Sequence, residues 1–165
     1  MNDARRRLLY LGLGEWAAGF CFVFLFAAWQ HELSVGTAAQ WALALLVFVL
    51  GQGGTYWLIR YRSLSRREPI GRNVVNLFTG LQYIDRLLLL GVPVAILAAY
   101  EGTPDLLFAI ACYLFAAAEY VNYYEFRLSY GKSGFNVKKL RNTGLRRSSL
   151  YRLLRKERSK NPYRG

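Results

Sequence analysis

Residues 116–130 read AAAEYVNYYEFRLSY and lie where a long apolar segment of the chain turns polar and aromatic. In this stretch a carboxylate (Glu119), an amide (Asn122) and four tyrosines follow a run of apolar residues. Directly after Phe126 comes a basic segment, residues 127–165, which holds thirteen of the 22 Lys and Arg residues but one of the ten acids. The stretch therefore predicts the end of a membrane-spanning helix, followed by a segment that carries the whole formal net charge of +12.

Upstream of this basic segment, the apolar residues gather in four long blocks. The blocks cover residues 8–29, 38–59, 74–100 and 105–126. A hydrocarbon core about 30 Å thick needs about 20 helical residues to cross it, and no block has the continuous polar face of a soluble amphipathic helix. The predicted fold is therefore all-α. A bundle of four transmembrane helices occupies residues 1–130, and a basic cytoplasmic tail occupies residues 131–165.

The charges between the blocks predict the orientation. Arginines precede the first block and fill the connection over residues 60–72, and the tail is basic. The other two connections carry no Lys or Arg, and their charged or titratable residues are His31, Glu32, Glu101 and Asp105. A Lys/Arg excess in short loops marks the cytoplasmic side. Both termini are therefore predicted in the cytoplasm, with the chain in the inner (plasma) membrane.

Seven polar residues fall at a similar depth when the four blocks are aligned at their cytoplasmic ends. Residues 87–100 alone are too few to cross the membrane, so Asp85 and Arg86 are predicted to lie within it. Ionisable groups at that depth are costly and usually find partners in the protein interior. Two interpretations stay open: a buried network centred on Arg86 that fixes how the helices dock, or a cytosol-facing cavity for a cation, a proton or a small ligand. The predicted cluster consists of Glu15, Gln52, Gln82, Asp85, Arg86, Glu119 and Asn122.

Glycines indicate where the helices approach one another. Gly12, Glu15 and Gly19 share one face of the first block, which we expect to face the bundle because small residues allow close helix packing in lipid. In the second block, residues 51–54 read GQGG. This sequence is compatible with close contact to a neighbouring helix or with a break that exposes backbone carbonyls to a polar cavity.

The tail contains a short predicted helix over residues 150–158, which Ser148 or Ser149 is placed to cap. Its leucines lie on one side and its cations elsewhere, the pattern of an amphipathic helix that lies on a membrane surface with its leucines among the headgroups. Each cation near an anionic membrane contributes about 1 kcal/mol. Anionic lipid is therefore the predicted partner of Arg146, Arg147, Arg152, Arg155, Lys156 and Arg158.

The sequence gives little support to catalysis. Its one histidine, His31, lies on the far side from the polar cluster, and no nucleophile–base pair, phosphate-binding loop or set of metal ligands is recognisable, so no catalytic, cofactor or metal site is predicted. Nucleic acid binding is not favoured, because the tail lacks a recognisable fold for it.

Two hypotheses for function remain. One is a non-enzymatic membrane subunit or regulator whose tail contacts anionic lipid or an acidic cytosolic partner. The other is a small channel, transporter or oligomeric permeabilising effector. A cytosolic or membrane protein partner, or a homo-oligomer, is compatible with either.

Three short motifs carry a resemblance. Residues 119–124 (EYVNYY), 127–130 (RLSY) and 145–150 (LRRSSL) resemble the C-terminal signature of a group of small bacterial four-pass membrane proteins, known as uncharacterised or general-stress proteins. The resemblance implies a bacterial inner-membrane protein without assigned chemistry. It transfers no catalytic residues.

Overall fold

The structure is a computed structural model that describes residues 3–126 and 147–160, without the side chains of residues 157–160. Its helices are α1 (Asp3–Trp29), α2 (Thr37–Arg66), α3 (Arg72–Ala99), α4 (Thr103–Tyr120), the π-helix η1 (Val121–Glu125) and α6 (Ser149–Lys160). The described part of the chain contains no β-sheet, only an isolated bridge between Phe126 and Arg147. The prediction of an all-helical fold with four long apolar helices is confirmed.

Four helices are long and apolar enough to cross a membrane: α1, α2, α3, and α4 taken together with η1. Many of their large apolar side chains point outward, among them Phe24, Leu90 and Leu107. In the most apolar window of α1, only 11% of the residues are buried within the protein. Extensive exposed apolar surface marks contact with a partner or a membrane, and four such helices suggest a multi-pass membrane protein.

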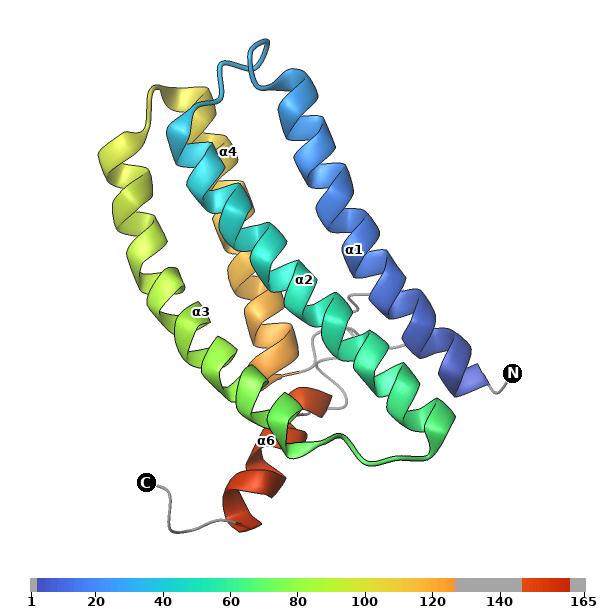
Figure 1. The fold of residues 1–165 in the computed structure, drawn as a ribbon. Helices are drawn as coiled ribbons and strands as arrows, with labels where there is room; N and C mark the ends of the chain where they lie inside the picture. Colours follow the sequence, from blue (N-terminus) through green and yellow to red (C-terminus); the bar gives the residue numbers. More distant parts are fainter. Residues whose placement is uncertain (1–2, 127–146, 161–165) are drawn as a thin grey trace, which may run out of the picture.

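The bundle has two ends of opposite charge. The α1–α2 and α3–α4 connections lie at one end, while the start of α1, the α2–α3 connection and α6 lie at the other (Figure 1). We call the first the acidic end, because it carries Glu32, Glu101 and Asp105, and the second the basic end, because of its arginines. Helix α2 contacts each of the other three long helices and forms the centre of the bundle.

The helices extend beyond the apolar blocks into their charged flanks. Helix α2 continues to Arg66, and Arg67 closes it in a left-handed conformation with φ of 58°. The next helix cannot begin at once, because Pro69 disfavours helical backbone in the residue before it. Pro93 lies inside α3 without ending it. The charged flanks therefore form helical turns that add length at the basic end.

Helices α1 and α2 approach each other through glycines. A Cβ atom on Gly12 would lie 3.1 Å from the carbonyl oxygen of Gly54, and one on Gly54 would lie 3.1 Å from the carbonyl oxygen of Gly12 and 2.7 Å from Trp16 Cδ1. Gly12 and Gly19 are the buried residues of α1, which confirms the packing face predicted for this helix. Because α2 is continuous through residues 51–54, close helix contact, and not a break, explains its glycines.

Asp105 joins the elements of the acidic end. Its side chain is fully buried, and its Oδ1 accepts hydrogen bonds from the backbone N–H groups of Gly36 and Ala39, both at 2.9 Å. Its Oδ2 accepts a third bond from the N–H of Glu101 at 3.1 Å. The first N–H groups of a helix lack intrahelical partners. The Asp105 carboxylate accepts from one of them, at Ala39 of α2, and from two N–H groups that precede α2 and α4. In the sequence, Asp105 indicates only the orientation of the chain.

Helix α6 packs against the basic end of the bundle. Leu150 and Leu154 are 2% and 3% exposed and belong to the same apolar cluster as Phe78 of α3. The hydroxyl of Tyr56 donates to Ser149 Oγ at 2.8 Å. The prediction that the leucines of this helix lie among lipid headgroups is therefore wrong for Leu150 and Leu154. The physical reason is that the ends of α2, α3 and η1 offer apolar protein surface, which buries these leucines more fully than a headgroup layer.

Candidate functional site

Three buried residues form a chain of hydrogen bonds between α2, α3 and η1. The Tyr124 hydroxyl donates to Gln52 Oε1 at 2.6 Å, and Gln52 Nε2 donates to Asp85 Oδ1 at 2.8 Å. An amide has one acceptor oxygen and two N–H donors, so these two bonds determine its orientation. The second carboxylate oxygen of Asp85 is buried and has no hydrogen-bond partner among the described residues. Gln82, one turn before Asp85 on α3, is also buried.

A second polar group lies between α1 and the end of α4. Asn122 Nδ2 donates to Glu119 Oε2 at 3.1 Å. The carboxylates of Glu119 and Glu15 are both near enough to the buried hydroxyl of Tyr123 to act on it electrostatically. The Tyr123 ring lies directly against Gly53, where a Cβ atom would overlap it. One of the glycines that the sequence singles out therefore makes room for this tyrosine.

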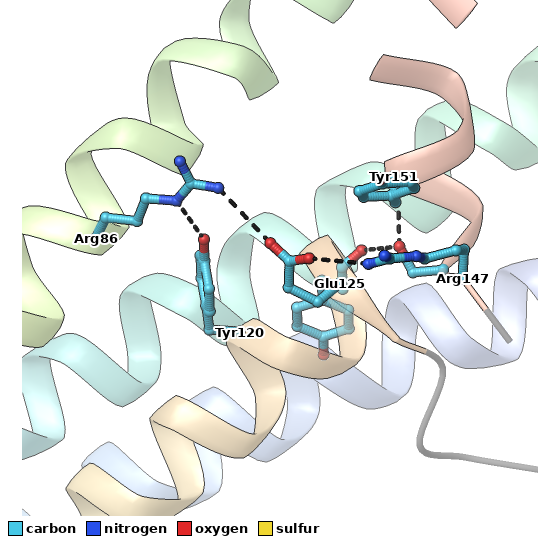
Figure 2. Close-up of polar contacts among 7 residues, drawn as sticks. Arg86, Tyr120, Glu125, Arg147 and Tyr151 are labelled. Carbon is cyan, nitrogen blue, oxygen red and sulfur yellow. Dashed lines mark hydrogen bonds and ion pairs between the residues drawn. The ribbon is translucent and has the colours of Figure 1, made fainter. Parts of the chain in front are cut away.

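Arg86 belongs to a third group, at the junction of α3, η1 and α6 (Figure 2). Its Nε donates to the hydroxyl of Tyr120 at 3.0 Å, and its Nη2 lies 3.6 Å from Glu125 Oε1. The other oxygen of Glu125 lies 3.4 Å from Nη1 of Arg147. Glu125 therefore stands between Arg86 of α3 and Arg147, which lies two residues before α6.

The predicted network centred on Arg86 is not the arrangement observed. Successive residues of an α-helix are about 100° apart around its axis, so Asp85 and Arg86 cannot face the same neighbours. Asp85 points into the bundle and is fully buried, whereas the side chain of Arg86 is 48% exposed. The predicted cluster is thus divided, with Gln52 and Asp85 in one group, Glu15, Glu119 and Asn122 in another, and Arg86 in the third.

The π-helix η1 positions the tyrosines of these groups. The N–H of Phe126 donates to the carbonyl of Val121 at 2.8 Å, a bond that spans five residues. Tyr123 and Tyr124 are both buried, and the Tyr124 ring stacks on Tyr120 with centroids 5.2 Å apart. Short π-helical segments are rare and frequently occur at functional sites. The sequence predicts no role for these tyrosines, although buried tyrosines usually need a partner for the hydroxyl.

The cations of the tail that the structure describes fall into two sets. Arg152, Arg155 and Lys156 are exposed on the outer side of α6. The guanidinium of Arg147 instead lies over the rings of Phe126 and Tyr151, 4.4 and 4.5 Å from their centroids. Arg146 and the side chain of Arg158 lie outside the described residues. Arg147 is therefore held in a defined place, and the other three face outward.

The described residues include no group of three His, Cys, Asp or Glu side chains placed to hold a metal ion. The two cysteines are free, Cys21 exposed and Cys112 buried. The side chains that do come together are hydrogen-bonding tyrosines and amides, carboxylates and arginines. Their arrangement suits the docking of helices and the binding of charged groups.

No family model, curated protein or solved structure matches this chain. The resemblance to small bacterial four-pass membrane proteins therefore stays a prediction.

Replacing Gln52 by leucine is expected to lower the free energy of unfolding by about 2 kcal/mol, because the Tyr124 hydroxyl and the Asp85 carboxylate both lose their partner. Tyr124→Phe keeps the bond between Gln52 and Asp85, and we expect it to cost about 1 kcal/mol. Gln40→Leu, the same change at an exposed position of α2, is the matched control, with an effect within about 0.5 kcal/mol. Unfolding in SDS, followed by tryptophan fluorescence, measures all three. Equal stability of Gln52→Leu and Gln40→Leu would contradict the importance of this chain of bonds.

Proposed function

We propose that the protein is a non-enzymatic integral membrane subunit or regulator of a bacterial inner membrane, with its basic end in the cytoplasm. The observation that carries the proposal is the docking of α6. Leu150 and Leu154 are buried against the bundle, whereas Arg152, Arg155 and Lys156 are exposed. The exposed cations therefore form a fixed basic surface, which suits anionic lipid or an acidic cytosolic partner.

The charge difference between the two ends supports the orientation. The arginines that precede the first apolar block and those of the α2–α3 connection lie at the same end as α6 (Figure 1). At the acidic end, Glu32 and Glu101 are exposed. Positively charged loops stay on the cytoplasmic side of the membrane, so the basic surface of α6 would meet the inner leaflet and the cytosol.

A conduit is the second candidate, and one observation favours it. The unpartnered oxygen of Asp85 is a polar atom in the bundle interior, as a cation- or proton-binding cavity would need. The interior of the bundle between Asp85 and Asp105 argues against a conduit. The buried side chains of α2 and α3 towards the acidic end are apolar, among them Leu45 and Ile96. A path through one copy of the chain would need polar groups there, so we favour the regulator.

Labelling of introduced cysteines tests the orientation. Arg152→Cys and His31→Cys, at exposed positions of opposite ends, are each treated with a membrane-impermeant maleimide on intact spheroplasts. We expect His31→Cys to react at once and Arg152→Cys to react only after the membrane is opened. The reverse pattern would overturn the proposal, and the unchanged chain is the control for Cys21.

Cross-linking and flux measurements then separate the two functions. We expect that proteins cross-linked in cells co-purify with the natural chain and are lost when Arg152, Arg155 and Lys156 are changed to glutamine. Changing the two arginines to lysine keeps the positive charge, so the cross-linked proteins are expected to be retained. We also expect liposomes that contain the protein to show no more ion flux than empty liposomes. A flux that Asp85→Asn abolishes would favour the conduit instead.

A further inference from the structure

We propose that Arg86 and Arg147, on either side of Glu125, form a binding site for the phosphate group of an anionic phospholipid of the inner leaflet. The site lies where α3, η1 and α6 meet (Figure 2). The inference rests on the proposed function in one respect, the placement of the basic end at the inner leaflet. It adds a defined lipid site to a basic surface that would otherwise attract anionic lipid without a fixed position.

The charges at this junction do not balance. Two guanidinium groups share one carboxylate, which leaves a formal charge of +1. The N–O distances of 3.6 and 3.4 Å are longer than the roughly 2.7–2.9 Å of a close charge-assisted hydrogen bond. A guanidinium has five N–H donors, and Arg86 commits only its Nε–H to a close bond, with Tyr120. Donors and positive charge therefore remain for an anion.

Both arginines are accessible and are held in place. Their side chains are 48% and 45% exposed, so a ligand can reach them from outside the bundle. The guanidinium of Arg147 lies over two aromatic rings, and the N–H of Ser148 donates to the backbone carbonyl of Glu125 at 3.0 Å. Arg86 is anchored at its Nε by Tyr120. Little side-chain freedom would be lost when an anion binds, which favours affinity.

The depth of Arg86 indicates that the anion belongs to a lipid. From Arg86 to the end of α3 at Ala99 the helix rises only roughly 20 Å, less than the hydrocarbon core of about 30 Å. An exposed arginine at this depth extends towards the headgroups and needs a negative partner there. Leu90, one turn deeper than Arg86 on the same face of α3, is 74% exposed and would lie along an acyl chain. A soluble phosphate would gain nothing from this apolar surface.

Arginine is well suited to this ligand, because its planar fork of N–H groups matches the oxygens of a phosphate. Glu125 holds the two guanidinium groups in place while no lipid is bound, and it competes with the phosphate for their N–H donors. The structure therefore predicts opposite effects within one site. Loss of either arginine weakens lipid binding, and loss of the carboxylate strengthens it.

The test titrates the purified full-length protein, in detergent, with dioctanoyl phosphatidylglycerol, and follows binding by native mass spectrometry and by thermal stability. Arg86→Gln and Arg147→Gln are each expected to weaken binding about fivefold, the equivalent of one cation near a lipid phosphate. Glu125→Gln is expected to tighten it by a similar factor. Arg62→Gln and Arg66→Gln, at exposed positions of α2 at the same end of the bundle, are the matched controls, with changes of less than about twofold.

Three results would overturn the site: equal weakening in Arg62→Gln, equal binding of dioctanoyl phosphatidylcholine, or weaker binding in Glu125→Gln. Equal stabilisation by inorganic phosphate would show an anion site without a lipid and would overturn the lipid assignment. Glu125→Gln keeps the test decisive if the arginine variants fail to fold. A failure of the lipid site can be told apart from a failure of the proposed function. Maleimide labelling of Arg152→Cys and His31→Cys reports the orientation independently of the lipid titration.

Discussion

Asp105→Ala is expected to lower the free energy of unfolding by about 4 kcal/mol, the largest effect of any single substitution considered for this protein. The carboxylate accepts backbone hydrogen bonds from Gly36, Ala39 and Glu101 and is fully buried. A hydrogen bond to a charged group contributes about 1.5–3 kcal/mol, and a buried donor left without a partner costs a similar amount. Alanine would release all three N–H groups and separate the α1–α2 connection from the start of α4.

Two controls accompany the alanine variant. Asp105→Asn keeps an oxygen for Gly36 and Ala39 but places an amino group near the N–H of Glu101, so about half of the loss is expected. Glu32→Ala removes an exposed carboxylate at the same end and is expected to change stability by less than about 0.5 kcal/mol. Unfolding in SDS measures the three variants together. A loss in Asp105→Ala no larger than that in Glu32→Ala would contradict the role given to this carboxylate.

Gly53→Ala is expected to destabilise the protein by about 3 kcal/mol, at the upper end of the cost of overpacking a core. The added methyl group would overlap the ring of Tyr123, which is buried and whose backbone carbonyl accepts a hydrogen bond from Ser148. The ring therefore has little room to withdraw. The sign of this stability change is informative. Without a clash, alanine at this position would stabilise the helix by about 1 kcal/mol, because it is the better helix former.

Gly91→Ala is the matched control for this prediction, because a Cβ atom at this position of α3 meets no atom within 4 Å. We expect it to leave stability unchanged or slightly raised. A double variant, Gly53→Ala with Tyr123→Ala, would recover part of the loss if the clash is the cause, since substitutions of residues in contact are not additive. Additive losses in the double variant would show that Gly53 acts through something other than this ring.

The polar residues show how far sequence reasoning reaches. The glycines of residues 51–54 were compatible with a close helix approach or with a break, and the structure has the close approach. Tyr123, however, is far away in the sequence and was not identified as the neighbour of Gly53. Asp85 and Arg86 were predicted to share a network because they fall at a similar depth in the membrane, yet consecutive residues of a helix face different neighbours. Nothing in the sequence except its charge distinguished Glu125, which lies between Arg86 and Arg147.

The sequence alone determined the long apolar helices and the concentration of cations at one end. Both are local properties: helix length follows from the apolar run of each block, and charge follows from composition. The tertiary structure alone decided which side chains meet, including the contact of Asp105 with the α1–α2 connection and the docking of Leu150 and Leu154 on the bundle. The physical reason is that the rotation and crossing of apolar helices depend on packing between segments distant in the chain. An apolar sequence of nearly uniform composition does not specify those contacts residue by residue.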